Sequence, residues 1–369
     1  MGGLNEKEGL NALMRVMVIF GGRSREHAVS LASARAIMDA LQRSEQYEVL
    51  PLGITREGQW ISSGDPMREL ESRAQELVGG RTGSGGVAGT MISASDKLPV
   101  DLGAADVVFP VLHGPYGEDG TVQGMLELAG IPYVGSGVLA SAVGMDKVTM
   151  KKIFTFHGLP QVEWLGLTRK EWQDDRKRWA REIETSLGYP CFVKPSNLGS
   201  SLGISRATNA GELRAALDTA TGLDRRVIIE QGVDAREIEV SVLGNEEAKV
   251  SVPGEIVVSE HGFYDYEAKY TEGGMRLVVP AQIPGGVATE LRYIARAAYA
   301  AIDAAGMARV DFFLENGGAQ RLLLNEINTI PGFTPTSVYA RLWAASGLSY
   351  EQLLDRLIQL ALERHGSGS

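Results

Sequence analysis

Short apolar runs alternate with amphipathic stretches along the first third of the chain. The amphipathic stretches carry apolar residues at i, i+3 and i+4, the spacing typical of a helix packed on one side. The pattern predicts strands at 16–22, 47–54, 106–114 and 131–135, and helices at 26–43 and 121–130. Alternating strands and helices are typical of a parallel sheet with helices on both faces.

The pattern of apolar and charged residues changes near Lys147, where a predicted helix at 146–158 precedes a highly charged helical stretch at 168–186. We interpret that stretch as a solvated face. Further strands are predicted at 190–196, 225–233, 237–245, 252–258 and 275–283, and helices at 209–220, 286–306 and 350–365. The chain therefore reads as three α/β-type regions, at residues 1–145, 146–243 and 244–369, with a Gly/Ser-rich loop at 79–93.

Composition narrows the class of protein. A chain of 369 residues exceeds what one core usually supports. The net charge of −10 argues against a nucleic-acid-binding surface, although local basic clusters can bind small anions. No apolar run reaches the roughly 20 residues that cross a bilayer, and acids precede any apolar run at the N-terminus, so we expect a cytosolic protein with no membrane partner. The lone Cys191, in the apolar setting YPCFV, predicts a buried thiol rather than a nucleophile.

A predicted hairpin near the end of the chain carries the strongest chemical signal. Glu326 and Asn328 are two residues apart and project from one face of a strand. A turn at 316–318 can fold the preceding strand beside them and add Asp311. Three oxygen-bearing side chains at one place suit Mg²⁺, which shares its shell with substrate phosphates. The alternative is a half-exposed strand face with solvated acids.

A second signal is Lys194, which ends a strand and precedes a loop of small residues, Gly199-Ser200-Ser201-Leu202-Gly203. Such a loop lets backbone N–H groups approach an anion, and the lysine adds charge. The alternative is an ordinary Gly/Ser turn. Glu230 ends the strand VIIEQGV and Glu237 follows; they are candidate readers of adenine and ribose, or solvated acids.

Two common motifs also match. Gly135–Ala140 fits G-x-G-x-x-G/A, but it closes a series of βα units, and the acid expected about 20 residues on is absent. Gly199–Gly203 fits the hydrolase elbow G-x-S-x-G, but the later histidines are only His261 and His365. A Walker A loop is excluded because the chain has no Gly-Lys dipeptide.

The chain resembles the ATP-grasp ligases, and among them the D-alanine–D-alanine ligase family. The resemblance covers nearly the whole chain, and its motifs arrive in family order: HGPYGEDGTVQGMLELAGIPYVGSG, MDKVTMK, VKPSNLGSSLGIS, FYDYEAKY and NEINTIPGFTPTS. It implies an α/β three-domain ATP-grasp fold, with an N-terminal doubly wound parallel-sheet domain and ATP held between central and C-terminal α+β domains. The implied reaction joins two D-alanine molecules through a D-alanyl phosphate, for peptidoglycan precursor synthesis.

The resemblance also implies roles for the candidates above. Two Mg²⁺ ions, or Mn²⁺ in their place, would be held by Asp311, Glu326 and Asn328. The nucleotide would be contacted by residues on both sides of the cleft: Lys147, Lys194, Ser201, Glu230, the backbone near Gln231 and Val233, Glu237 and Lys269.

For the amino acids, the resemblance implies that Glu26 receives the ammonium of the first D-alanine, in a hydrogen-bonded set with Ser200 and Tyr270. His113 would lie near that substrate; alternatively it is only packed at a strand end. Arg309 and the Gly332 N–H would stabilise a tetrahedral oxyanion, and Ser337 with Val338 would bind the second D-alanine.

Some positions depart from the commonest family pattern. Glu26 is followed by His27-Ala28, where another acid is frequent, and Gln231 replaces a frequent basic residue. Tyr270 favours an amine as second substrate, because relatives that use D-lactate generally lack such a tyrosine. A homodimer is expected from the resemblance alone. The alternatives are a D-lactate or D-serine ligase, or a non-catalytic nucleotide-binding protein.

Overall fold

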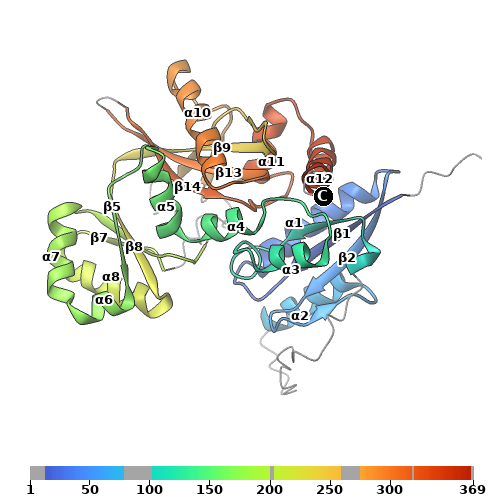
Figure 1. Cartoon of the computed structure of the whole chain (residues 1–369), viewed down its shortest axis with the longest axis horizontal. Coiled ribbons are helices and arrows are strands. Elements are labelled where there is room, and N and C mark those ends of the chain that lie inside the picture. Colours follow the sequence, from blue (N-terminus) through green and yellow to red (C-terminus); the bar gives the residue numbers. More distant parts are fainter. Residues whose placement is uncertain (1–12, 79–101, 200–202, 259–274, 318–319, 367–369) are drawn as a thin grey trace, which may run out of the picture.

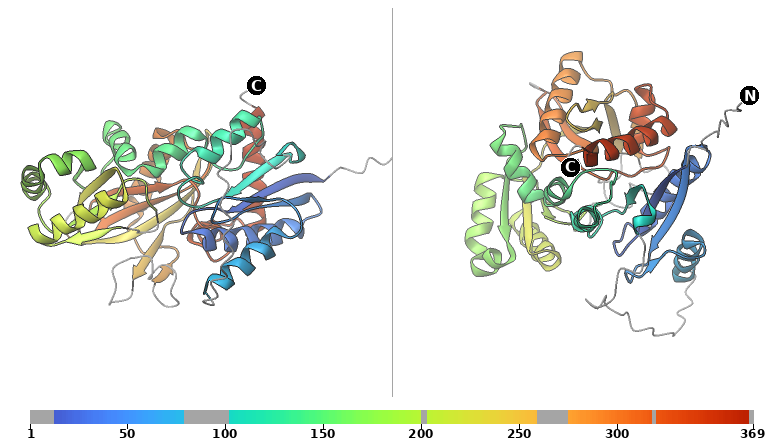
Figure 2. Two further views of the ribbon diagram at one scale, coloured as in Figure 1. Left: turned by 90° about the horizontal axis from the view of Figure 1, so that it is seen from below. Right: turned by 45° about the vertical axis from the view of Figure 1, so that its right-hand side comes forward.

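The computed structural model describes residues 13–78, 102–199, 203–258, 275–317 and 320–366, and these residues form three sheets with helices around them (Figure 1). Each sheet belongs to one region of the chain. The central region forms a lobe to one side, while the N-terminal and C-terminal regions lie against each other (Figure 2). The expected α/β three-domain fold is confirmed, with a mostly parallel N-terminal sheet and two antiparallel sheets.

The N-terminal sheet has the order β3-β2-β1-β4, from β1 (Met14–Gly21), β2 (Tyr47–Ile54), β3 (Trp60–Ile61) and β4 (Val107–Val111). β1 runs parallel to β2 and β4, and β3 is antiparallel to β2. Both faces of β1 are buried, which is why its run is continuously apolar. Val16, Val18 and Phe20 face one core, and Met17 and Ile19 face another.

Helices cover both of these faces. α1 (His27–Gln42) and α2 (Pro66–Val78) contribute to one core and α3 (Thr121–Ala129) to the other, with a short 3-10 turn at Leu102–Ala104. The strand predicted at 131–135 is wrong: it is a single parallel bridge from Tyr133 to Val108.

The central sheet has the order β5-β8-β6-β7 and is antiparallel throughout. Its strands are β5 (Trp164–Thr168), β6 (Cys191–Pro195), β7 (Ser205–Ala207) and β8 (Arg226–Gln231), and its helices are α6 (Arg169–Asp174), α7 (Arg176–Ser186) and α8 (Ala210–Leu223). The predicted charged stretch is thus two helices, because Asp175 ends the first and caps the second by accepting from the Arg178 N–H.

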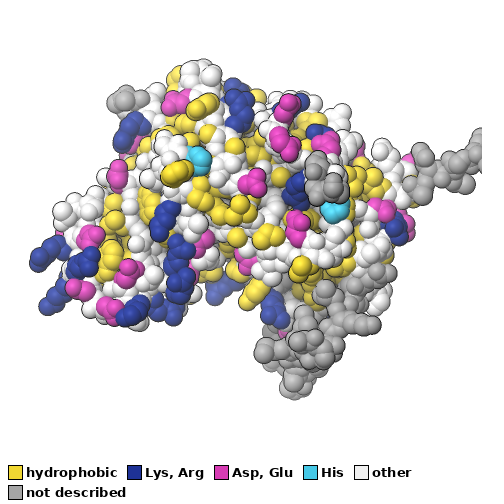
Figure 3. All heavy atoms as spheres, in the orientation of Figure 1, with side chains coloured by type: hydrophobic (Ala, Val, Ile, Leu, Met, Phe, Trp, Pro, Cys, Tyr) yellow, Lys and Arg dark blue, Asp and Glu magenta, His cyan; other side chains and the backbone are white. Residues whose placement is uncertain are grey.

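That stretch is not wholly solvated. Its Lys and Arg side chains gather on the surface of this lobe (Figure 3), but Trp172 and Ile183 point inward and are fully buried. The charges mark one face, and sparse apolar residues mark the other.

The C-terminal sheet has the order β12-β11-β9-β13-β14, with β10 paired to β9. Its strands are β9 (Ala235–Gly244), β10 (Lys249–Val250), β11 (Gly254–Val258), β12 (Met275–Val278), β13 (Gly306–Glu315) and β14 (Leu322–Asn328). β9 lies between β11 and β13, so this sheet begins at Ala235, ahead of the domain boundary predicted between 243 and 244.

Helices α10 (Gly285–Ala301), α11 (Val338–Ala345) and α12 (Tyr350–Gly366) complete the C-terminal region. α12 packs into the N-terminal core, and Tyr47 Oη donates to Asp355 at 3.0 Å. Two helices, α4 (Val138–Met145) and α5 (Lys147–Phe156), link the regions. Asp146 caps α5 by accepting from the Thr149 N–H at 2.8 Å. Over the described residues, every helix is too short or too polar to cross a membrane.

Candidate active site

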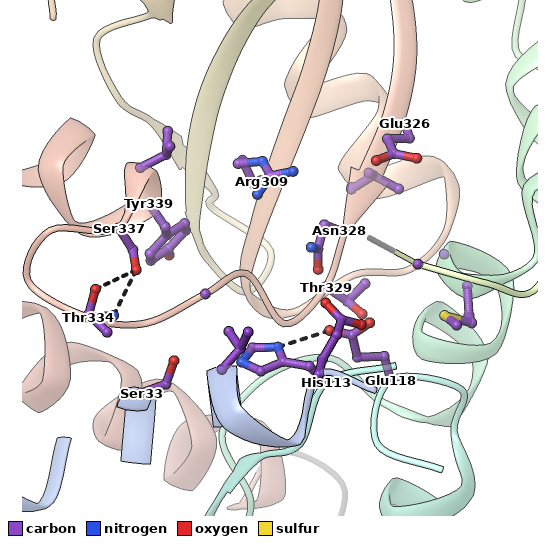
Figure 4. A pocket seen from close by; sticks show the side chains of 18 of the residues that line it. Ser33, His113, Glu118, Arg309, Glu326, Asn328, Thr329, Thr334, Ser337 and Tyr339 are labelled. Atoms are coloured by element: carbon purple, nitrogen blue, oxygen red, sulfur yellow. Dashed lines mark hydrogen bonds and ion pairs between the residues drawn. The ribbon is translucent and has the colours of Figure 1, made fainter. Parts of the chain in front are cut away.

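A cavity of about 580 Å³ opens where the three regions meet. The N-terminal region contributes Glu26, His113 and Glu118 to its wall, and the C-terminal hairpin contributes Arg309 on the opposite side (Figure 4). The other predicted site residues that line it are Lys147, Glu326, Asn328, Gly332, Ser337 and Val338.

The predicted hairpin is confirmed as β13 and β14, which pair antiparallel with Arg309 opposite Asn328 and Asp311 opposite Glu326. The register then shifts, because Phe312 pairs with Leu324 and leaves Asn325 without a partner residue. This is a β-bulge, a device that re-aims side chains. The Leu324 N–H points out of the hairpin and donates to the Pro160 carbonyl at 2.7 Å.

Arg309 and Asp311 share one strand face, as predicted. The guanidinium donates to both Asp311 oxygens at 2.7 Å, and its Nε lies 3.1 Å from Glu239 Oε2. Glu239 is buried on β9 directly opposite Asp311. Arg309 is therefore held by two acids, one on its own strand β13 and one on the neighbouring strand β9.

The predicted metal ligands lie together on this sheet. Glu326 and Asn328 line the cavity, and Asp311 is the residue opposite Glu326. Asn328 Oδ1 accepts from the Ile330 N–H at 3.0 Å, which fixes the amide. In the described part of the chain no group of three or more His, Cys, Asp and Glu side chains can hold a metal. The candidate set consists of two carboxylates and one amide, a donor set that fits a hard cation.

The nucleotide candidates surround a buried ion cluster. Glu230 Oε1 lies 2.6 Å from Lys151 Nζ, and its Oε2 lies 2.5 Å from Lys194 Nζ. Burial alone would raise the pKa of Glu230, but the two lysine charges outweigh it and hold that pKa at about 2. Lys147 Nζ donates to the Leu198 carbonyl at 3.0 Å and lies 3.8 Å from Glu326. Of these three lysines, Lys147 lines the cavity.

The remaining nucleotide candidates lie nearby on the two sheets. Glu237 is on β9, and its negative charge helps to raise the pKa of Lys194, whose burial alone would lower it. The Gln231 N–H donates to the Glu163 carbonyl, and the N–H of the next residue, Gly232, donates to Pro190. Val233 follows β8 and is half-buried.

Glu26 lies at the start of α1, where two glycines crowd its carboxylate. A Cβ on Gly114 would lie 3.1 Å from Glu26 Oε2, and a Cβ on Gly199 would lie 3.2 Å from it. The Ser/Gly loop of the central region thus begins against the N-terminal region. Ser200, Ser201, Lys269 and Tyr270 lie outside the described residues.

His113 is buried next to Glu118. Its Nδ1 lies 3.2 Å from Glu118 Oε1 and 3.1 Å from the Ile330 carbonyl, while Nε2 has no hydrogen-bond partner among the described residues. Burial would lower the pKa of His113, but the hydrogen bond and charge of Glu118 outweigh it and raise that pKa. A buried ring nitrogen at a cavity wall is available to a ligand.

Ser337 and Val338 begin α11, so the N-terminal end of that helix faces the cavity. Ser337 Oγ accepts from the Thr334 N–H at 2.9 Å. Gly332 is close by, because a Cβ there would lie 3.6 Å from Ser337 Oγ. A helix N-terminus favours an anion such as a carboxylate.

Two residues of the site were not among the predicted site residues, although Lys151 ends the motif MDKVTMK. Lys151 and Glu239 look like any surface charge, and only their pairing with distant residues shows their burial. The motif at 135–140 also has a structural use, because the Gly135 carbonyl accepts from Arg364 and Gly137 precedes α4. Cys191 is a buried thiol as predicted, and burial raises its pKa to about 11.

The chain is similar to known proteins over almost its whole length. Residues 15–136 match the family described as D-ala D-ala ligase N-terminus, and residues 153–359 match D-ala D-ala ligase C-terminus. A D-alanine--D-alanine ligase of Heliobacterium modesticaldum is 48% identical over 357 residues, 95% of each chain. One of Halothermothrix orenii is 46% identical over 350 residues, 95% of this chain and 98% of that one.

Solved structures of similar ligases superpose on nearly the whole chain. The D-alanine-D-alanine ligase of Coxiella burnetii superposes with a TM-score of 0.77 at 33% identity, covering 96% of each chain. The VanG D-Ala:D-Ser ligase of Enterococcus faecalis superposes with a TM-score of 0.78 at 34% identity, covering 95% of this chain and 99% of that one.

Proposed function

The chain belongs to the D-alanine–D-alanine ligase family, and we propose that the cavity between its three regions is where two D-alanine molecules are joined at the expense of ATP. The family uses ATP and serves peptidoglycan precursor synthesis. The observation that carries the proposal is the placement of Glu26, Arg309 and the N-terminus of α11 around one cavity.

In the first step, the carboxylate of one D-alanine attacks the γ-phosphorus of ATP, and ADP leaves. Glu26 receives the ammonium of this D-alanine. His113 Nε2, which has no partner within the part of the chain that the structure describes, lies on the same wall. Lys147 and Lys194 bring positive charge to the phosphates from α5 and β6. Positioning and charge account for most of the catalysis in such a transfer.

Asp311, Glu326 and Asn328 would hold Mg²⁺, which supplies charge neutralisation on the phosphates when bound. Asp311 then shares its oxygens between this role and Arg309. Glu239 keeps the guanidinium of Arg309 anchored from the other side. The pairing of β13 with β14 and with β9 brings these side chains onto adjacent strands.

In the second step, the amine of the other D-alanine attacks the acyl phosphate. A tetrahedral centre forms, a proton leaves the amine, and phosphate departs as the carbonyl reforms. Arg309 and the Gly332 N–H stabilise the oxyanion, and Ser337 at the start of α11 binds the second carboxylate. The support for these roles is that all three residues line the cavity.

The test is phosphate release from ATP with and without D-alanine and Mg²⁺, with the product identified by mass. We expect release only when both are present, and D-alanyl-D-alanine as product. Unchanged ATP hydrolysis with no dipeptide would refute the proposal. The VanG D-Ala:D-Ser ligase superposes equally well, so the assay should also be run with D-serine or D-lactate competing against D-alanine as the second substrate. A product that joins D-alanine to D-serine or D-lactate would identify the chain as a D-serine or D-lactate ligase. Family membership further leads us to propose a cytoplasmic homodimer.

A further inference from the structure

The buried ion cluster near the nucleotide candidates contains two lysines, Lys151 and Lys194, and one acid, Glu230. Lys151 and Lys194 flank Glu230, one at each carboxylate oxygen. The three side chains are 2%, 12% and 5% exposed for Lys151, Lys194 and Glu230. Charges so deeply buried are rare unless paired, and here two cations share one anion.

The local structure explains how the cluster is assembled. Lys147 and Lys151 are four residues apart on α5 and project from one face of the helix. Glu230 on β8 is opposite Phe192, and Lys194 lies two residues further along β6. Lys194 and Glu230 are therefore diagonal neighbours on one face of the central sheet. α5 lies over that face and brings Lys151 to the acid.

We propose that Lys151 is a positioning residue of the nucleotide site: it neutralises Glu230, so that Lys194 keeps its full positive charge for the nucleotide's phosphates. The inference rests on the proposed function only for the identity of the ligand. Lys151 is the most deeply buried of the three groups, at 2% exposed against 12% for Lys194, and its ammonium lies 2.6 Å from Glu230, so it acts through Glu230 and not by contact.

The charge of the cluster makes the idea quantitative. Lys151, Lys194 and Glu230 together carry one net positive charge, and without Lys151 their sum is zero. The charges of Glu237 and Glu326, which also act on Lys194, are the same in both cases. One unit charge acting over roughly 6–8 Å at an effective dielectric constant near 20 changes a binding constant about 30- to 100-fold. Binding of the nucleoside part should not depend on this charge.

The experiment compares ADP with adenosine, which lacks phosphates, by calorimetry. The readout is the ratio of the two dissociation constants, because a contact of Glu230 with adenine cancels from it. We expect Lys151→Met to lower the preference for ADP about 30- to 100-fold. The double variant Lys151→Met/Glu230→Gln restores the charge and should restore the ratio, and Glu230→Gln alone should raise it. Lys152→Met changes the exposed neighbour on α5 and is the matched control.

An unchanged ratio in Lys151→Met, or a double variant as poor as the single one, would overturn the inference. Equal losses for ADP and adenosine would mean a purely structural role and would also overturn it. If Lys151→Met does not fold, the double variant and Glu230→Gln decide, because neither leaves an unpaired acid. A wild-type protein that binds ADP but forms no dipeptide would refute the proposed function and leave this inference standing.

Discussion

Replacing Arg309 by Met would separate catalysis from stability. The change removes the two hydrogen bonds to Asp311 at 2.7 Å and the contact with Glu239 at 3.1 Å, and it leaves two buried acids side by side. Breaking a buried ion pair from one side costs about 3–5 kcal/mol. Loss of one oxyanion donor lowers turnover about 10²- to 10³-fold. Both effects should appear in Arg309→Met.

The matched control is Arg236→Met. Arg236 makes an equivalent two-bond pair with Glu255, at 2.8 and 2.7 Å, on the same sheet but away from the cavity. This pair is more exposed, at 28% and 15%, so its loss should cost about 1–3 kcal/mol. We expect Arg236→Met to keep its turnover within about threefold once folded.

The assay has two parts. Urea unfolding gives the stability of each variant, and steady-state kinetics at a temperature where both are folded give kcat and the KM for ATP. We expect Arg309→Met to lose kcat while the KM for ATP changes less than about threefold. If both variants lose activity only in proportion to their stability, Arg309 is structural and the reasoning about the oxyanion is wrong.

Three further outcomes are expected. Gly199→Ala should raise the KM for D-alanine about three- to tenfold, because its Cβ would lie 3.2 Å from Glu26 Oε2. Gly222→Ala is the control and should leave the KM unchanged, because no described atom lies within 4 Å of its Cβ. Equal KM values for the two variants would contradict the prediction. Glu326→Gln should lower kcat more than about 100-fold with little change in ADP affinity, and parallel losses would make it only a binding residue. Between pH 4.5 and 2, wild type should lose about 3 kcal/mol more stability than Glu230→Gln. The pKa of Glu230 is lowered from 4.5 to about 2 in the folded protein, so the ionised carboxylate stabilises the fold above pH 4.5 and this stabilisation is lost as the pH falls to 2. Urea midpoints that fall in parallel for the two proteins across this range would refute the prediction.

The sequence predicts those parts of the fold that depend on neighbours in the chain. β2 matches its predicted range of 47–54, and the hairpin carries Asp311, Glu326 and Asn328 on one face as period-two alternation requires. The bulge at Asn325 does not follow from that alternation, because it depends on Pro160 taking the Leu324 N–H.

The burial of charged residues follows from the sequence less directly than the burial of apolar residues. In the stretch 168–186 the dominant signal is polar, yet Trp172 fills the core of the central lobe. Lys151 of α5 is paired in its buried position with Glu230 of β8, and Glu239 of β9 with Arg309 of β13. A solvated charge and a buried paired charge look alike in one sequence, and the difference lies in contacts between residues far apart in the chain.

The position of α12 has a consequence for how the chain is made. The core on one face of the N-terminal sheet includes Val16 and Phe20 of β1 together with Leu353 and Leu357 of α12. The buried core of the central lobe, over the described residues, consists of residues between Leu167 and Ile229. During translation the central lobe has all its core residues as soon as it leaves the ribosome. One face of the N-terminal sheet is covered early by α1 and α2, but the core on that face is complete only when α12 has been made. Contacts so distant in sequence slow folding, so the domain that is synthesised first is completed last.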